Sequence, residues 1–176
     1  RRSRGLGDVY KRQRKNVENM IAVILVASIE SELVREIGSR PELSHLRGLP
    51  KALLPLAGKS ILDHWWSAIR GRRTITQVYI VTNGAKYKAY ERWATSKGLP
   101  VRNVVNNGTT TKEGRLGAAR DLLKGLTRAK ATDEDVLVFG GENIFYEGFD
   151  IEGPLRYFET TVKSKGSLAL TYELSE

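Results

Sequence analysis

Lys51 is the residue that its neighbours place best for contact with a phosphate. It lies between Pro50 and Pro55, in a stretch that follows an apolar run and leads into an amphipathic segment. Each proline fixes φ near about −65° and disfavours helical backbone in the residue before it, so the spacing predicts a stiff, non-helical turn. An ammonium group held in such a turn can neutralise phosphate oxygens. The same spacing also suits a lysine that only faces water.

A carboxylate and an amide follow another apolar run. Glu142 and Asn143 come directly after Gly140 and Gly141, whose missing Cβ atoms allow the backbone to approach other groups closely. Mg²⁺ prefers oxygen ligands and usually binds one or two carboxylates together with substrate phosphates. Glu142 is therefore a candidate Mg²⁺ ligand. The alternative is a Gly-Gly turn with an exposed glutamate.

A third candidate region runs from Asn106 to Ala119. It combines hydroxyl groups, basic side chains and glycines, among them Gly108 and Gly117, directly before a predicted helix. Backbone N–H groups at a helix start bind anions, so this run is a candidate nucleotide cradle. Ordinary loops and helix caps use the same residue types.

Five runs rich in Val and Ile alternate with helix-like segments, a pattern typical of a mostly parallel sheet covered on both faces. Because right-handed crossovers bring the carboxyl ends of such strands to one edge, we expect the candidate residues to meet there. The predicted fold class is a three-layer α/β/α domain. Its predicted strands are Ile21 to Ala27, Gln77 to Thr82, Val101 to Val105, Asp135 to Gly140 and Ser167 to Tyr172.

Helical spacing of apolar residues predicts four helices between these strands. Ser60 is a plausible N-cap of the first helix, in which Trp65 and Trp66 are interpreted as core and packing residues. A fourth helix is predicted from Pro154 to about Lys163. The other members of the helical patterns are Ile61, Leu62 and Ile69, then Tyr87, Tyr90 and Trp93, and then Leu116, Leu122, Leu123 and Leu126.

Composition excludes several function classes. The chain has no cysteine and only two histidines, so a disulfide framework, a thiolate metal site and a cysteine nucleophile are ruled out and a zinc site is disfavoured. Gly58-Lys59-Ser60 is not a Walker A loop, since the required earlier glycine is Leu53. Apolar runs are shorter than the roughly 20 residues of a membrane span. We expect a soluble, cytoplasmic protein that does not bind membranes.

The net charge of +9 is concentrated at the N-terminus, where residues 1–19 carry +5. The chain starts with Arg1, and Met20 directly precedes the first predicted strand. Residues 4–13 resemble the translation of a library adapter, so we interpret residues 1–19 as a non-native or disordered basic tail and residues 20–176 as the domain. The alternative is a basic arm for nucleic acid; the prediction is that the domain itself binds none.

Taken in order, these pieces resemble the sugar-phosphate nucleotidyltransferases. The resemblance covers Met20 to about Tyr172 and suggests a Rossmann-like nucleotide-diphospho-sugar transferase fold, with a run after Gly108 similar to that of a eukaryotic branch. The segments that carry it are Ile24 to Ala27, Pro50 to Lys59, Leu62 to Trp65, Val78 to Asn83 and Gly141 to Tyr146. Because the chain ends four residues after the last predicted strand, we expect a C-terminally truncated domain.

This resemblance implies a reaction in which a sugar 1-phosphate attacks the α-phosphorus of an NTP and releases pyrophosphate with the help of Mg²⁺. Lys51 matches the family's phosphate-contacting lysine, and Glu142 stands where the family usually has a metal-binding aspartate. The remaining matches are expected to bind the nucleotide. They are Ala27 and Ser28 after the first strand, Asn83 after the second, and Gly108 and Gly117 in the third region.

The chain departs from the family in the loop after its first strand. The family has a glycine-rich loop with an arginine there, whereas this chain has Ser28 to Leu33, including Glu30 and Glu32. Negative charge where triphosphate oxygens should lie weakens the prediction of catalysis. Leu33, Val34 and Ile37 instead suggest a short helix that closes the site. The alternative function is a catalytically degenerate, regulatory relative that binds a nucleotide or nucleotide sugar.

Overall fold

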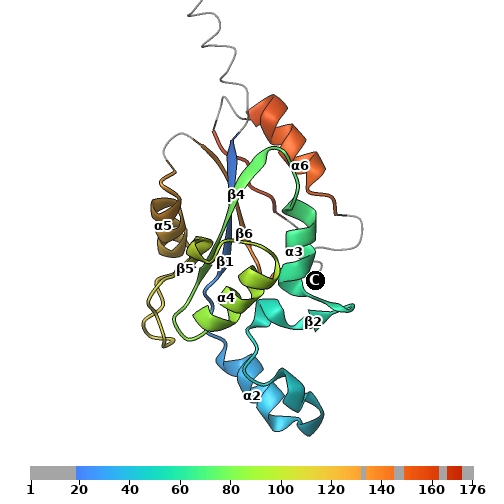
Figure 1. Ribbon diagram of the computed structural model, residues 1–176, viewed down its shortest axis with the longest axis vertical. Coiled ribbons are helices and arrows are strands. Elements are labelled where there is room, and N and C mark those ends of the chain that lie inside the picture. Colours follow the sequence, from blue (N-terminus) through green and yellow to red (C-terminus); the bar gives the residue numbers. More distant parts are fainter. Residues whose placement is uncertain (1–18, 132–133, 145–148, 163–165, 172–176) are drawn as a thin grey trace, which may run out of the picture. The chain divides into compact units, whose positions relative to one another are not determined.

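The computed structural model describes residues 19–131, 134–144, 149–162 and 166–171 (Figure 1). The chain divides into two compact units, the first ending at Asn143 and the second beginning at Ile144. The predicted basic tail falls outside the described residues, apart from Asn19 at its end. Among the described residues, no helix is both long and apolar enough to cross a membrane.

A four-stranded parallel sheet forms the centre of the first unit. Its strands are β1 (Met20–Val26), β4 (Ile75–Thr82), β5 (Val104–Asn106) and β6 (Asp135–Gly140), in the order β5-β4-β1-β6. In the central register, Ile24 lies opposite Ile80 on one side and Phe139 on the other. The chain is thus α/β, as predicted, and the loops that follow β1, β4, β5 and β6 leave from one edge of this sheet.

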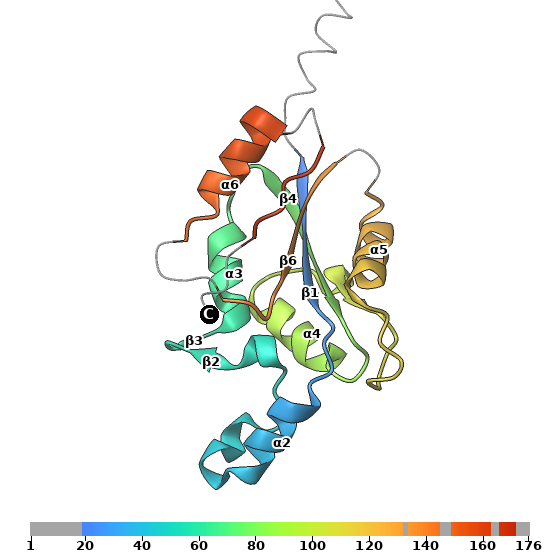
Figure 2. The ribbon, with the colours of Figure 1, turned by 180° about the vertical axis from the view of Figure 1, so that it is seen from behind.

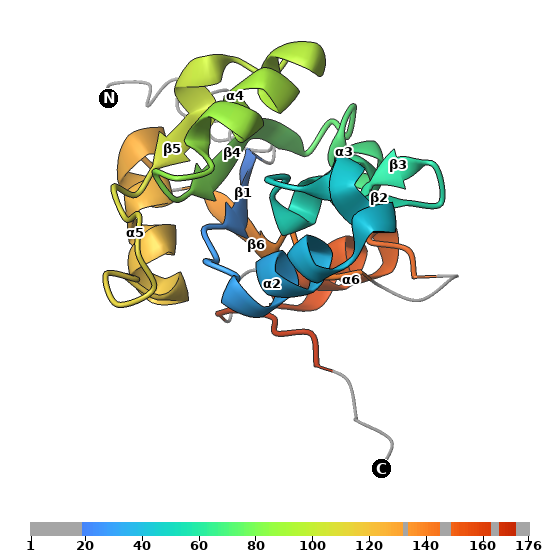
Figure 3. The same cartoon turned by 90° about the horizontal axis from the view of Figure 1, so that it is seen from below.

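Helices cover both faces of the sheet, which gives the predicted three layers (Figure 3). On one face, Ile21 and Val23 of β1 pack with Tyr79 and Val81 of β4 under helix α5 (Ala118–Ala129). On the other face lie α3 (Ile61–Ile69) and α4 (Tyr87–Ser96). Alternate β1 side chains point to opposite faces, so its near-continuous burial follows from a sheet covered on both sides.

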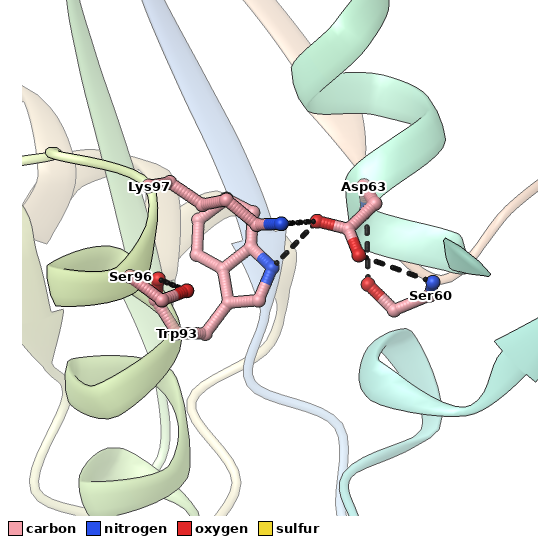
Figure 4. Close-up of polar contacts among 5 residues, drawn as sticks. All are labelled: Ser60, Asp63, Trp93, Ser96 and Lys97. Atoms are coloured by element: carbon pink, nitrogen blue, oxygen red, sulfur yellow. Dashed lines mark hydrogen bonds and ion pairs between the residues drawn. The ribbon is translucent and has the colours of Figure 1, made fainter.

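Asp63 connects α3 to α4 (Figure 4). Its backbone N–H donates to the Ser60 hydroxyl at 3.1 Å, and its carboxylate accepts from the Ser60 backbone N–H at 3.2 Å, which completes the capping box at the predicted N-cap. The same carboxylate accepts from Trp93 Nε1 at 3.1 Å and lies 2.7 Å from Lys97 Nζ. Burial alone would raise the pKa of Asp63. The hydrogen bonds from Lys97, Ser60 and Trp93 lower it by a larger amount, so the net shift of the pKa is downward.

Between β1 and α3 the chain forms several short elements. They lie at the end of the sheet where β1 leads into α2 (Figure 2). The short helix expected around Leu33, Val34 and Ile37 is confirmed as α2 (Ser31–Ser39). It is followed by two 3₁₀ helices and a small hairpin. These are η2 (Pro41–Leu46), η3 (Lys51–Leu53), β2 (Pro55–Leu56) and β3 (Lys59–Ser60).

Two predicted segments have different local structure. The turn after Pro50 is helical, since η3 forms one 3₁₀ turn in which the Leu53 N–H donates to the Pro50 carbonyl at 2.9 Å. Proline at the start of such a turn loses no hydrogen bond, because first-turn N–H groups have no partner within a helix. The predicted strand from Val101 begins as the 3₁₀ helix η4 (Val101–Asn103), and only Val104 to Asn106 pair with β4.

Two apolar patterns were also misleading. Leu116 precedes α5, and Leu123 on α5 is 63% exposed, whereas Leu122 and Leu126 pack on the sheet as predicted. The strand predicted from Ser167 to Tyr172 is wrong over residues 167–171, which have no strand structure; Tyr172 lies outside the described residues. A β-prone sequence becomes a strand only when a partner accepts its hydrogen bonds.

The second unit contains α6 (Glu152–Tyr157), followed by a π-helical turn, η5 (Phe158–Val162). The helix predicted from Pro154 therefore exists and starts two residues earlier, with Pro154 still in its first turn, where no hydrogen bond is lost. Lys163, the predicted end, lies outside the described residues.

Candidate functional site

Asn83 fixes the loop that follows β1. Its side chain is only 1% exposed, and its amide donates to the carbonyl of Ser28 at 2.8 Å and to that of Ala27 at 3.4 Å. Its Oδ1 accepts from the backbone N–H of Lys86 at 2.9 Å. Both polar ends of Asn83 are thus used internally, so it positions Ser28 rather than presenting its amide to a ligand.

The turn after β6 brings Glu142 next to that loop. The Gly141 N–H donates to the carbonyl of Leu25 at 3.0 Å, so the pairing with β1 continues past the end of the strand. A Cβ on Gly141 would lie 2.6 Å from side-chain atoms of both Ile24 and Val26, which explains why glycine is required here. Glu142 therefore leaves the sheet directly beside the carboxyl end of β1.

Trp65 supports the same turn from α3. It is buried, and its ring stacks on Phe139 of β6 with ring centres 4.1 Å apart. Its indole N–H donates to the carbonyl of Asn143 at 2.9 Å. Trp66 packs edge-on against Trp93, with ring centres 5.9 Å apart. Both tryptophans pack as predicted, and Trp65 additionally holds the backbone that carries Glu142.

Ser28 connects two carboxyl groups. Its hydroxyl is hydrogen-bonded to Glu142 and, at 3.0 Å, to Glu30. Since a hydroxyl has a single proton, both contacts are satisfied together only when one of the carboxyl groups is protonated. Burial raises the pKa of Glu142 to about 7, and Glu30 acts in the same direction, while the Ser28 hydrogen bond and the charge of Lys51 oppose the rise. The three side chains form an acidic cluster with hard oxygen donors.

Lys51 reaches this cluster from η3. Its Nζ lies 3.8 Å from Oε1 of Glu30, and its side chain is 43% exposed. An ion pair this long and this exposed stabilises the fold little. The ammonium group therefore stays available to an anion at the edge of the cluster.

One cavity, the Gly117 cavity, has a volume of about 480 Å³ and gathers most of the predicted nucleotide-binding residues. Gly117 caps α5 with φ of +83°, a conformation that favours glycine, and opens the helix start toward this space. Ala27, Ser28, Gly117 and the proposed metal ligand Glu142 all line it. The other lining residues are Leu25, Arg115, Leu116, Ala118 and Asp121.

A second cavity, the Tyr90 cavity, has a volume of about 220 Å³ and lies on the α2 side of the acidic cluster. It shares Ser28 and Glu142 with the Gly117 cavity, and it is also lined by Lys51, Glu30 and Tyr90. The predicted phosphate contact, Lys51, thus adjoins this smaller cavity. The two cavities meet at Ser28 and Glu142.

Gly108 is not among the residues that line either cavity, and neither is Asn83. Gly108 has φ of +85°, and its N–H donates to the side chain of Asn106 at 2.8 Å. The next residue, Thr109, accepts from the Gly84 N–H at 2.7 Å through its carbonyl. These bonds make the loop after β5 a braced turn, so the structure gives Gly108 a local conformational role.

Sequence reasoning missed Tyr90 and Lys86 and used Glu30 only as an unfavourable charge. Tyr90 was interpreted through its helical spacing with Trp93, which correctly predicts burial but does not show where its hydroxyl lies. Arg115, which lines the Gly117 cavity, stood within the quoted third region but was not singled out. For Lys86, no signal in the sequence separates it from other surface lysines.

The oxygen atoms of the acidic cluster fit the kind of Mg²⁺ site in which substrate phosphates complete the coordination. In the part of the chain that the structure describes, no three His, Cys, Asp or Glu side chains converge on a metal position. Glu142, Glu30 and the Ser28 hydroxyl nevertheless offer three hard oxygen donors, and Mg²⁺ commonly completes its shell with waters and phosphate oxygens.

Comparison with protein-family models gives no match for this chain, and comparison with curated proteins gives none either.

Proposed function

We propose that this chain is a nucleotidyltransferase domain with a Rossmann-like nucleotide-diphospho-sugar transferase fold. It would transfer a nucleoside monophosphate from an NTP to a phosphate-bearing acceptor and release pyrophosphate; the sequence resemblance indicates a sugar 1-phosphate as the acceptor. The observation that carries this proposal is the Gly117 cavity, in which Ala27, Ser28, Gly117 and Glu142 come together from three separate segments. Ligands of open α/β sheets bind at this edge.

The start of α5 offers the triphosphate a set of backbone donors. The first N–H groups of a helix have no partner within it, and the helix dipole favours negative charge there. Arg115, exposed in the same cavity wall, adds a positive charge. Mg²⁺ at Glu142 and Ser28 would supply positive charge to the phosphate oxygens. Lys51 would neutralise phosphate oxygens on the other side of the cluster.

A specific observation favours the alternative, a catalytically degenerate nucleotide-binding protein with a regulatory role. Glu30 pairs with Lys51, and α2 begins at Ser31, where the resembling family has its glycine-rich phosphate loop. A carboxylate competing for the phosphate-binding lysine weakens phosphate binding. Nucleotide binding without transfer would identify this alternative.

The test combines binding with turnover. Calorimetry with a panel of NTPs in Mg²⁺ buffer should show one nucleotide bound, and Lys51→Met should weaken its affinity at least tenfold. Lys59→Met is the matched control, because Lys59 is exposed and lies outside both cavities. Pyrophosphate release is then measured for each NTP with sugar 1-phosphates and other phosphate monoesters.

Each outcome has a distinct meaning. Release with one NTP and acceptor pair supports the transferase. Binding without release from any pair supports the degenerate, regulatory protein. If no NTP binds, or if Lys51→Met and Lys59→Met bind the NTP equally well, the assignment of Lys51 to phosphate is wrong.

A further inference from the structure

Asp121 is a buried carboxylate in the first turn of α5. Its side chain is only 7% exposed, and it forms no ion pair within the part of the chain that the structure describes. Its Oδ1 accepts from Asn107 Nδ2 at 2.8 Å. Aspartate is seldom this buried unless its charge is paired or its oxygens are hydrogen-bonded, so the second oxygen needs an explanation.

The second oxygen of Asp121 opens into the Gly117 cavity. Within the described residues, Oδ2 accepts no hydrogen bond. It is not sealed off either, because the described buried polar atoms that lack both a partner and contact with solvent are Trp66 Nε1 and the Tyr90 hydroxyl. Asp121 lines the Gly117 cavity, which is therefore the space that this oxygen reaches. A ligand in the cavity can supply the missing donor.

A buried network holds the Asp121 carboxylate in place. Asn107 is 5% exposed, and its Oδ1 accepts from the backbone N–H of Thr109 at 2.8 Å and from the Thr109 hydroxyl at 2.7 Å. With its oxygen used in this way, Asn107 directs its amide N–H group to Asp121. Of these three side chains, Asp121 alone lines either of the two cavities. The network thus ends in an acceptor that is presented to a ligand at a fixed place.

This acceptor restricts which part of a nucleotide can lie beside it. A carboxylate only accepts hydrogen bonds, so phosphate oxygens cannot bond to it and their charge is repelled. The neighbouring group of the ligand must carry donors, as nucleobases and ribose hydroxyls do. Leu25 and Leu116 line the same cavity and offer apolar surface to the faces of a flat ring.

The spacing of the strands favours the base over the ribose. The Asn107 N–H donates to the carbonyl of Thr82, the last residue of β4, at 2.8 Å, which ties Asp121 to the end of that strand, whereas Glu142 follows β6. Since β1 lies between β4 and β6, their ends are two strand spacings apart, about 10 Å. In an extended nucleotide the Watson–Crick edge of a purine lies about this far from the α-phosphate, and the ribose hydroxyls lie nearer. With the phosphates at Glu142 and Ser28, the group at Asp121 is the base.

We propose that Asp121 selects guanine, so that the nucleotide of this domain is GTP. Guanine carries two adjacent donors, N1–H and the 2-amino group, and the carboxylate can accept both, because Oδ1 keeps a lone pair beside the bond from Asn107. Adenine and cytosine would turn a bare ring nitrogen toward the carboxylate beside their single amino group. In uracil, two carbonyls flank the single N–H. This inference rests on the proposed function and names its nucleotide.

The transfer step is then that of a guanylyl group. The triphosphate would follow the start of α5 to Glu142 and Ser28. A phosphate oxygen of the acceptor attacks the α-phosphorus of GTP and forms a new P–O bond. The bond from the α-phosphorus to the oxygen that bridges to the β-phosphate breaks, and pyrophosphate leaves with that electron pair. Nothing is oxidised or reduced.

Calorimetry on the 176-residue chain in Mg²⁺ buffer compares GTP with three other nucleotides. ITP lacks the 2-amino group, XTP has a carbonyl in its place, and ATP has a bare N1. We expect GTP to bind at least tenfold tighter than ITP, because one hydrogen bond to a charged group is lost. It should bind on the order of a hundredfold tighter than XTP or ATP, which turn an acceptor toward the carboxylate. Equal affinity for GTP and ITP, or tighter binding of ATP, would overturn the proposal.

Asp121→Asn should reverse the preference between GTP and XTP. The introduced amide keeps an oxygen for Asn107 and turns an N–H group toward the cavity, where it matches the 2-carbonyl of xanthine. We expect XTP to bind at least tenfold tighter than GTP in this variant. A residue that only supports the fold would weaken all nucleotides alike. An unchanged preference for GTP would refute the assignment, and the comparison of GTP with ITP in wild type decides the matter even if the variant fails to fold.

Glu113→Gln is the matched control. It makes the same change from carboxylate to amide, in the loop before α5, at an exposed residue that lines neither cavity. The wild-type order of nucleotides should be kept in this variant. A reversal of the GTP and XTP preference in Glu113→Gln as well would show that the effect does not come from Asp121.

A wider titration with UTP, CTP and 2′-deoxy-GTP separates this inference from the proposed function. If another NTP binds best and its affinity depends on Lys51, the guanine assignment is wrong and the nucleotide site stands. If no NTP binds, both are wrong. Equal affinity for every base, together with weaker binding of 2′-deoxy-GTP, would place the ribose at Asp121 and overturn the guanine assignment. Pyrophosphate release with GTP alone would support both.

Discussion

Glu142 should make the free energy of unfolding depend on pH in the neutral range. Its pKa is about 7 in the folded chain against an ordinary value of 4.5, because burial disfavours the carboxylate and Glu30 adds a like charge. Between these two values the folded state binds more protons than the unfolded state. The stabilisation is therefore complete below about pH 4.5 and is lost as the pH rises through 7.

The magnitude follows from the same pair of values. Each unit of difference between the folded and unfolded pKa corresponds to about 1.4 kcal/mol, so the full change in the free energy of unfolding would be about 3 kcal/mol. Glu142 is only half-buried, and solvent screens its interaction with Glu30. We therefore expect a loss of about 1.5 kcal/mol between pH 5 and pH 8.

Urea unfolding at pH 5 and pH 8, with a chelator present to remove divalent ions, measures this loss directly. Glu142→Gln carries no titratable proton at this position, so the loss should vanish and the variant should be the more stable protein at pH 8. Glu36→Gln is the control, because Glu36 is exposed on α2 and its ion pair contributes little. An equal loss in wild type and Glu142→Gln would show that Glu142 is not responsible.

Two further predictions concern packing and capping. Gly125→Ala places a Cβ 2.9 Å from Val23 and 3.0 Å from Val81, so over-packing beneath α5 should lower the free energy of unfolding by about 1–3 kcal/mol. Gly38→Ala meets no atom within 4 Å and should raise the free energy of unfolding slightly. Thermal unfolding of both variants measures this difference, and equal stability would contradict the prediction. Asp63→Ala removes a carboxylate that accepts from the Ser60 N–H, Trp93 Nε1 and Lys97 Nζ (Figure 4), and it should lower the free energy of unfolding in urea by about 2 kcal/mol. A loss below about 0.5 kcal/mol would show that these contacts do not stabilise the packing of α3 against α4.

Hydrophobic pattern sufficed to predict the central strand β1, which is buried on both faces, and the edge strand β6, which is only partly buried. The runs at Ile21 and Asp135 became β1 and β6 with ends within a residue or two, because a continuous apolar run fits few other places in an α/β domain. The hydrophobic pattern failed for the short run from Val101, in which only Val104 to Asn106 pair with β4, and it failed over residues 167–171, which form no strand. Strand formation there depends on a hydrogen-bonding partner that the local sequence does not specify.

For the candidate site, too, one part could be predicted from the sequence and another part could not. Chain order and residue type were enough to predict that Ser28, Gly117 and Glu142 come together, since parallel strands deliver their following loops to one edge. What these residues and Lys51 bind stays a prediction. The position of Asn83 at a strand end was predicted, but not that its amide N–H group holds the loop after β1 while its oxygen accepts from Lys86.

The sequence by itself determined the layer architecture and which segments reach the carboxyl edge of the sheet, because periodicity and strand order are properties of the chain. Only the tertiary structure decided how the side chains at that edge are paired. Ser28 lies between two carboxyl groups, Lys51 faces Glu30, and the Tyr90 hydroxyl is left without a partner. These pairings join residues up to 114 positions apart, so they depend on packing that no local pattern encodes.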